Sequence, residues 1–172
     1  WYNIDFNKPF RHSDLLRNID NTDDSILSSS ANVSLSKYIT PTIDSSIAYT
    51  LSFNNNLYHP HTGHNSGAGG IVASTGFYIT GNSTNKYFWD DDGNGNLRRY
   101  YLVGSIRTYA DTTAGTIDYT TGIITTKAIS ISTIDNVDGV PSRRIRVTVV
   151  PNSKDIVPLR NQLLEIDFEN TT

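Results

Sequence analysis

Alternating apolar and polar residues predict a chain built mainly from β-strands. Within Ser46–Phe53 every second residue from Ile47 onward is apolar, which places these side chains on one face of a strand. Clusters rich in Gly, Asn, Asp and Pro separate the alternating runs, as expected for turns. We expect strands at Trp1–Phe6, Ser25–Thr40 (one long strand or two), Ser46–Phe53, Ile71–Thr80 (broken at Gly76), Tyr87–Trp89, Leu97–Val103, Ser105–Tyr109, Thr116–Tyr119, Ile123–Ile131, Arg143–Val150 and Leu163–Phe168.

Only one segment has convincing helical spacing. Leu15, Leu16 and Ile19 recur at intervals that share one helix face. Ser13 is a suitable N-cap residue and Asp14 would follow it in the first turn, where a negative charge is favourable. The sequence therefore predicts one short helix beginning at Ser13.

Two glycine-containing turns predict hairpins. Asp90–Asn96 separates two aromatic strands, and its Asn-Gly pair suits a type I′ turn. Thr120–Gly122 looks like a second, tighter turn. We predict a mainly β fold, α+β with one short helix, with antiparallel sheets and hairpins. A small helix-plus-strand lobe at residues 1–45 would precede a sandwich-like β module at residues 46–172.

Composition supports the β prediction and removes several function classes. Glu occurs only twice and Ala seven times, whereas Ile occurs 18 times and Tyr 10 times. There is no Cys, so disulfides, thiolate metal sites and cysteine nucleophiles are excluded. The net charge is −3 and charges of both signs are interleaved, unlike the basic footprint of a nucleic-acid binder. No apolar run has the length of a membrane span.

The chain begins at Trp1 and enters a strand-like run at once. We therefore expect it to be a fragment of a longer polypeptide.

The most specific local motif is Asp90–Leu97. Asp90, Asp92 and Asn94 alternate and Gly95 follows, as in the first half of a calcium-binding loop. However, Tyr101 stands where such a loop has its bidentate Glu, and neither flank has a helical pattern. We therefore favour a hairpin turn over a calcium site.

A second motif, Tyr58–His64, contains three histidines. His59 and His61 would point the same way in an extended segment, so they could share a transition metal with His64 nearby. The glycines that follow, up to Gly70, are more typical of a surface loop. We interpret the histidines as loop residues that form ordinary hydrogen bonds.

Signatures of catalysis are missing. The chain has no Gly-x-Ser-x-Gly elbow, phosphate-binding loop or dinucleotide fingerprint. Paired carboxylates for glycoside cleavage could come from Asp90–Asp92, but Glu is nearly absent and we do not favour this interpretation. Arg143, Arg144 and Arg146 lack flanking aromatic residues and are better suited to a solvated face or a protein interface. We predict a protein that is not an enzyme, with no catalytic, cofactor-binding or metal-binding residues.

The order of several motifs resembles a known family. Phe6–Ile19, an extended lead-in followed by the Ser-Asp helix start, resembles the beginning of a recurring unit in J-like baseplate proteins, with a strand to follow at Ser25–Ser36. The later segments look like the C-terminal half of the baseplate wedge subunit of large contractile-tailed bacteriophages. These segments are Tyr58–His61, Phe88–Leu97, Ala114–Gly122, Lys154–Ile156 and the closing strand. Asn21–Asp24 departs from the Val-Gly-Val turn of many relatives.

This resemblance implies a structural virion protein of the phage tail baseplate, assembled in the host cytoplasm. It implies pairing with a second copy of itself as a homodimer and contacts with other wedge proteins, but no nucleic acid, membrane or cofactor. Candidate contact surfaces are the His59–Gly70 loop, the Asp90–Asn96 tip and the Arg143–Val150 strand. Two alternatives stay open: a β-sandwich adhesin or carbohydrate-binding module that uses calcium at Asp90–Asn96, and a hydrolase fragment whose triad is invisible in sequence.

Overall fold

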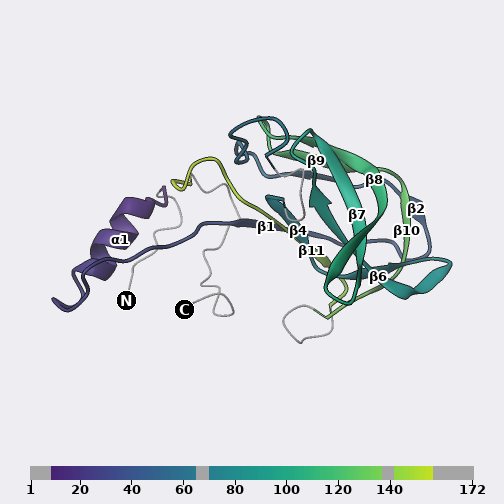
Figure 1. The fold of residues 1–172 in the computed structure, drawn as a ribbon, viewed down its shortest axis with the longest axis horizontal. Coiled ribbons are helices and arrows are strands. Elements are labelled where there is room, and N and C mark those ends of the chain that lie inside the picture. Colours follow the sequence, from purple (N-terminus) through teal and green to yellow (C-terminus); the bar gives the residue numbers. More distant parts are fainter. Residues whose placement is uncertain (1–8, 65–69, 137–141, 157–172) are drawn as a thin grey trace. The chain divides into compact units, whose positions relative to one another are not determined.

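A computed structural model describes residues 9–64, 70–136 and 142–156 (Figure 1). The chain divides into two compact units, one of Trp1–Asn32 with Lys154–Thr172 and one of Val33–Ser153. The division expected after residue 45 stays a prediction. The strands expected at Trp1–Phe6 and Leu163–Phe168 lie outside the described residues.

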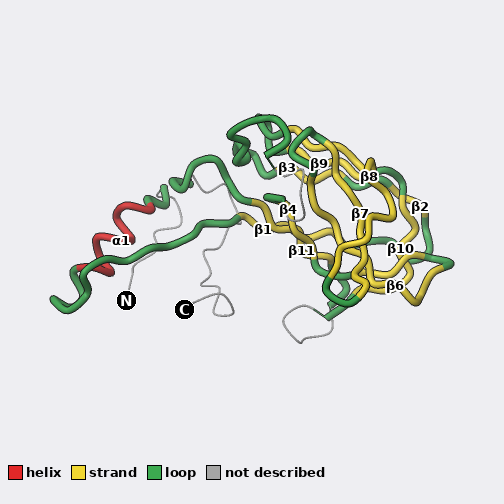
Figure 2. The backbone as a smooth tube through the Cα atoms, viewed as in Figure 1, coloured by secondary structure: helices red, strands yellow, loops and turns green. Residues whose placement is uncertain are grey.

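The fold class is as predicted: mainly β, with one short helix and antiparallel strand pairing (Figure 2). Among the described residues, no helix is long and apolar enough to cross a membrane. The elements are α1 (His12–Asp20), β1 (Leu35–Ile39), β2 (Ser46–Ile47), β3 (Thr50–Ser52), β4 (Val72–Ser74), β5 (Phe77–Ile79), β6 (Asn82–Asp91), β7 (Asn96–Val103), β8 (Ile106–Asp118), β9 (Ile123–Thr126), β10 (Ile129–Ile134) and β11 (Ile145–Val149).

The helix begins one residue earlier than predicted. The N-cap position is Arg11, whose side chain makes no capping hydrogen bond, so the prediction of Ser13 as N-cap is wrong. A carboxylate distant in sequence serves the first turn instead, because the backbone N–H of His12 donates to Asp155 Oδ1 at 2.9 Å. Asp14 lies in the first turn as predicted.

Several predicted strand boundaries are wrong. Of Ser25–Thr40 only Leu35–Ile39 forms a strand, and Ser46–Phe53 is interrupted at Ala48 and Tyr49. Ser105–Tyr109 and Thr116–Tyr119 belong to the single long strand β8, because the polar residues between them still pair with β7. Conversely, Ile123–Ile131 is split into β9 and β10 by Lys127 and Ala128, which belong to neither strand. The expected break at Gly76 is confirmed: β4 and β5 join different sheets on either side of it.

The larger sheet has eight strands in the order β2-β10-β5-β6-β7-β8-β9-β3. Its two terminal strands, β2 and β3, are separated in the chain only by Ala48 and Tyr49. Two linking residues can span roughly 11 Å at most, so the two ends of the sheet must lie close together. Register shifts along β7 and β8 help the sheet to curl. The sheet is therefore rolled around its own interior.

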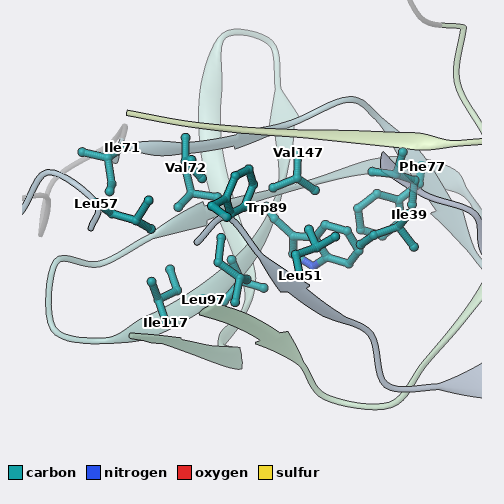
Figure 3. Packing of buried hydrophobic residues seen from close by; sticks show 14 of the residues in the cluster. Ile39, Leu51, Leu57, Ile71, Val72, Phe77, Trp89, Leu97, Ile117 and Val147 are labelled. Carbon is teal, nitrogen blue, oxygen red and sulfur yellow. The ribbon is translucent and has the colours of Figure 1, made fainter. Parts of the chain in front are cut away.

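The smaller sheet has the order β1-β11-β4. Both sheets contribute to one hydrophobic core, in which Trp89 of β6 lies among residues such as Val72 and Val147 from the smaller sheet and Leu51 and Leu97 from the larger one (Figure 3). Burying one Val, Leu, Ile or Phe side chain in such a core contributes roughly 1.5–3 kcal/mol to the stability of the fold. This core fixes the inner and outer faces of β6, β7 and β8.

Candidate functional site

The structure brings the two candidate metal motifs together. The ring Nε2 of His59 lies 3.0 Å from the backbone oxygen of Gly93, and the backbone N–H of Gly63 donates to the same oxygen at 2.9 Å. Because a carbonyl oxygen can only accept, Nε2 of His59 carries the proton. The loop that carries His59, His61 and His64, called the histidine loop below, therefore packs on the tip of the β6–β7 hairpin.

The β6–β7 hairpin is present, but its turn is shorter than predicted. Asp90 and Asp91 pair with Arg98 and Leu97 at the end of the ladder, so they are strand residues and not part of the turn. The remaining loop has positive φ at Gly93 and Gly95, with Asn94 between them. The predicted type I′ geometry, which needs positive φ at two adjacent central residues, is therefore wrong.

Asp90 is the centre of an ionic network on the face of the sheet opposite Trp89. Its side chain is 1% exposed and accepts from Arg98 Nε at 2.9 Å and Arg98 Nη2 at 3.1 Å. Arg107 Nη1 and the Tyr109 hydroxyl also donate to its Oδ2, at 2.8 and 2.9 Å. Of these four hydrogen bonds from three side chains, three are to Oδ2 and one is to Oδ1, so most of the lone pairs that a calcium ion would need are occupied.

Asp91 points to the opposite, inner face. Its carboxylate accepts from the backbone N–H of Val72 at 3.1 Å and from the Tyr119 hydroxyl at 2.8 Å. A Cβ at Gly70 would overlap this carboxylate, so only glycine fits there. The bond to Asp91 and burial together raise the pKa of Tyr119 far above its ordinary value, burial being the larger cause. Asp91 thus anchors the end of the histidine loop.

Asp92 closes the turn itself. Its Oδ1 accepts from the backbone N–H of Asn94 at 2.7 Å and of Asn96 at 3.0 Å, and its Oδ2 accepts from the Asn96 side chain at 2.7 Å. Burial alone would raise the pKa of Asp92, but these hydrogen bonds hold it below the ordinary value. The acidic run therefore works inside the fold, which argues against the calcium interpretation.

The three histidines contact one another and backbone oxygens. The His59 ring stacks on Tyr119 at 4.2 Å and meets the His64 ring edge-on at 5.0 Å. Nδ1 of His61 lies 3.1 Å from the Thr62 oxygen, and Nδ1 of His64 lies 3.2 Å from the His61 oxygen. Within the described ranges, no group of three or more His, Cys, Asp or Glu side chains is placed to hold a metal ion.

The third candidate surface, Arg143–Val150, contains β11. This strand lies in the middle of the three-stranded sheet, with β1 on one side and β4 on the other. Its backbone is therefore already paired along both edges and cannot add a strand from another subunit. Only its side chains are left for contacts.

Two features were missed from sequence. The β7–β8 hairpin presents three exposed aliphatic residues at its tip: Leu102 is 47% exposed, Val103 58% and Ile106 74%. The sequence predicted strands on both sides of Gly104 but not that they pair as a hairpin, and exposure of the tip has no signature in the pattern. The second feature is a pocket of about 210 Å³ beside Arg99.

Comparison with known proteins gives one match. Residues 3–38 match the family baseplate structural protein gp6, C-terminal domain III. The match covers about a fifth of the chain and includes α1 and most of β1. It supports a phage baseplate protein family, and with it a structural role in a phage tail and contacts with other baseplate proteins. No curated protein and no solved structure matched the chain.

Proposed function

We propose that this chain is a structural component of the baseplate wedge in a contractile phage tail, where it pairs with a second copy of itself and contacts other wedge proteins. The observation that carries this proposal is the match of residues 3–38 to the gp6 domain. The order of the later motifs, Tyr58–His61, Phe88–Leu97 and Ala114–Gly122, extends the same resemblance along the chain.

The described side chains support a structural role. The motifs that could have carried chemistry, Asp90–Asp92 and His59–His64, form hydrogen bonds within the fold. A carboxylate that already accepts several hydrogen bonds within the fold does not serve readily as a base or a metal ligand. The acidic residues and the histidines fix loops on a rigid sheet. A rigid sheet that presents loops suits a protein that acts through its surfaces.

The tip of the β7–β8 hairpin supplies a candidate contact. Leu102, Val103 and Ile106 expose aliphatic surface around the turn at Gly104, whose φ is +61°. Exposed apolar patches commonly mark interaction sites. The outer face behind the tip carries Tyr100 and Tyr109, and Tyr is enriched in the buried centres of protein interfaces.

Light scattering after size-exclusion chromatography tests self-association. We expect a mass near twice 19.1 kDa at high protein concentration. Ile106→Asp should weaken association by roughly tenfold or more, because an unpaired carboxylate would be buried in the contact. Thr112→Asp, at an exposed position of the same strand, is the matched control. A monomer at every concentration would end the homodimer proposal.

Mass spectrometry of purified virions tests the location separately. Peptides of this chain should be found with the tail fraction of the phage that encodes it, in a fixed ratio to other baseplate proteins. Their absence from virions would overturn the baseplate proposal even if the chain dimerises. Binding to a glycan array by a persistent monomer would favour the adhesin alternative.

A further inference from the structure

The pocket beside Arg99 lies on the inner face of the rolled sheet, the face that carries Trp89. It has a volume of about 210 Å³ and is lined by residues of β6, β7 and β8 and by the segment in which β9 ends and β10 begins. Pockets for drug-sized ligands are usually larger, roughly 300–1,000 Å³. A single side chain or a small organic ion is the size of occupant that fits.

Arg99 has an unusual position in this pocket. It pairs with Trp89 of β6 and therefore points to the inner face. On its other side it pairs with Asp111, and the strand register shifts both before and after this pair. Such irregularities re-aim side chains and are frequent near functional sites. Here the irregularity places a guanidinium beside the aromatic rings of the core.

The Nε of the Arg99 guanidinium lacks a hydrogen-bond partner among the described residues. This Nε is fully buried, and Cζ of the guanidinium lies 5.4 Å from the centre of the Tyr87 ring. Arginine stays charged at every accessible pH and offers five N–H donors. Leaving a buried charged donor unpaired is costly. The buried Nε therefore leaves a donor open to an acceptor from outside the chain.

The other charges of the pocket define that group. Lys127 Nζ donates to Thr113 Oγ1 at 2.9 Å, which uses one of its three donors. Asp111 Oδ1 accepts from the backbone N–H of Thr113 at 2.9 Å. Two cations and one carboxylate leave one positive charge, so the pocket is balanced by one negative charge. A doubly charged phosphate or sulfate would meet repulsion from Asp111.

We propose that this pocket binds one carboxylate group, held by the guanidinium of Arg99 with Lys127 at the rim. A planar carboxylate matches the fork of donors that arginine presents. The group could belong to an acidic side chain of another protein or to a free monocarboxylic acid. The proposal concerns the pocket alone and stands whether or not the chain is a baseplate component.

NMR of the arginine Nε–H signals tests this directly on the full chain. Arg99 is one of nine arginines, and its signal can be assigned from its loss in Arg99→Gln. Adding acetate should move this signal and the indole N–H of Trp89 in a saturable way. A capped peptide with one Glu should do the same. Tighter binding of the peptide would identify an acidic side chain as the natural group, and tighter binding of acetate would identify a free acid.

Two variants and one control check the assignment. Arg99→Gln should weaken binding about tenfold or more, because it removes a charge-assisted pair. Lys127→Gln should weaken it by a few-fold at most, since Lys127 is exposed and its side chain can be replaced without disturbing the core. Arg17→Gln, on α1, should leave binding unchanged.

Three results would overturn the proposal. The first is no saturable shift of the Arg99 signal with acetate or peptide. The second is an equal shift with chloride at the same ionic strength, which would reveal general screening. The third is tighter binding of phosphate or sulfate than of acetate. If Arg99→Gln does not fold, the Arg99 signal is assigned from its loss in Arg99→Met, and the wild-type titration then decides the matter.

Discussion

Arg98 and Arg99 are neighbours on β7 but have opposite surroundings. Arg98 is 6% exposed and donates to both oxygens of Asp90 and, at 2.7 Å, to the backbone oxygen of Asp91. Its guanidinium also lies 4.3 Å above the Tyr109 ring. Arg99, on the other face of the same strand, has a buried Nε without a partner.

The difference separates two uses of a buried charge. A buried charge with a full set of partners fixes the structure, because removing one partner leaves the others uncompensated. A buried charge with an incomplete set adds little stability but can recognise a group of opposite sign. We therefore assign the Asp90–Arg98 network to the fold and Arg99 to binding, and each assignment predicts different responses to substitution.

Of the substitutions considered, Asp90→Ala should lower the free energy of unfolding the most. It would leave Arg98 buried without its counter-charge and remove the acceptor of Arg107 and Tyr109. Breaking a buried pair in this way costs about 3–5 kcal/mol. Urea denaturation should show this loss in the free energy of unfolding. The exposed Asp24→Ala should change stability by less than about 0.5 kcal/mol. A loss below about 1 kcal/mol for Asp90→Ala would contradict the structural assignment.

The Asp90–Arg98 pair was within reach of sequence reasoning. Alternation predicted both strands of the hairpin, and once the turn is centred on Asn94, antiparallel pairing puts Asp90 opposite Arg98. The run Asp90–Asp92 resembled a calcium loop because Asp and Gly at these spacings occur both in calcium-binding loops and in hairpin turns. The local pattern could not reveal which acceptors were already filled.

Other features depend on tertiary pairing that no local pattern specifies. Asp111–Gly115 looks like a break because it is polar and small, yet β8 runs through it with β7 along one edge and β9 pairing with its end. The register shifts around Arg99 arise in this stretch. A one-residue shift changes the face of every side chain beyond it, so the pocket could not be predicted.

Arg98→Met should cause the second largest loss in the free energy of unfolding. It leaves the carboxylate of Asp90 with Arg107 and Tyr109, so the network is weakened but not abolished. We expect a loss of about 2–3 kcal/mol, typical of hydrogen bonds to a charged group. The double variant with Asp90→Ala should be more stable than the sum of the two single losses predicts, because the two residues interact directly. Strict additivity would show that the pair is not coupled.

Tyr109→Phe should have a smaller effect that depends on pH. Burial, and then the hydrogen bond to Asp90, raise the pKa of Tyr109 above its ordinary value of 10.0. A raised pKa means that the neutral phenol stabilises the fold below about pH 10 and that this contribution is lost as the pH rises further. At pH 7 the variant should lose about 0.5–1.5 kcal/mol.

Denaturation at pH 7 and above pH 10 measures both parts of this prediction. The stability of the wild type should fall between the two conditions, and that of Tyr109→Phe should fall less steeply. Parallel curves for the two proteins would mean that Tyr109 does not contribute to the alkaline loss of stability.

Arg99→Met should have the smallest effect on stability and the opposite sign. The substitution removes a guanidinium with an unpaired buried Nε and places an unbranched apolar side chain beside Trp89 and Tyr87. The desolvation cost of the charge disappears, so the free energy of unfolding should be unchanged or should rise by up to about 1 kcal/mol. Urea denaturation of Arg99→Met and Arg98→Met under one set of conditions compares the two faces of β7 directly. A loss above about 2 kcal/mol for Arg99→Met would mean that Arg99 has a structural partner, and the carboxylate site would then lose its main support.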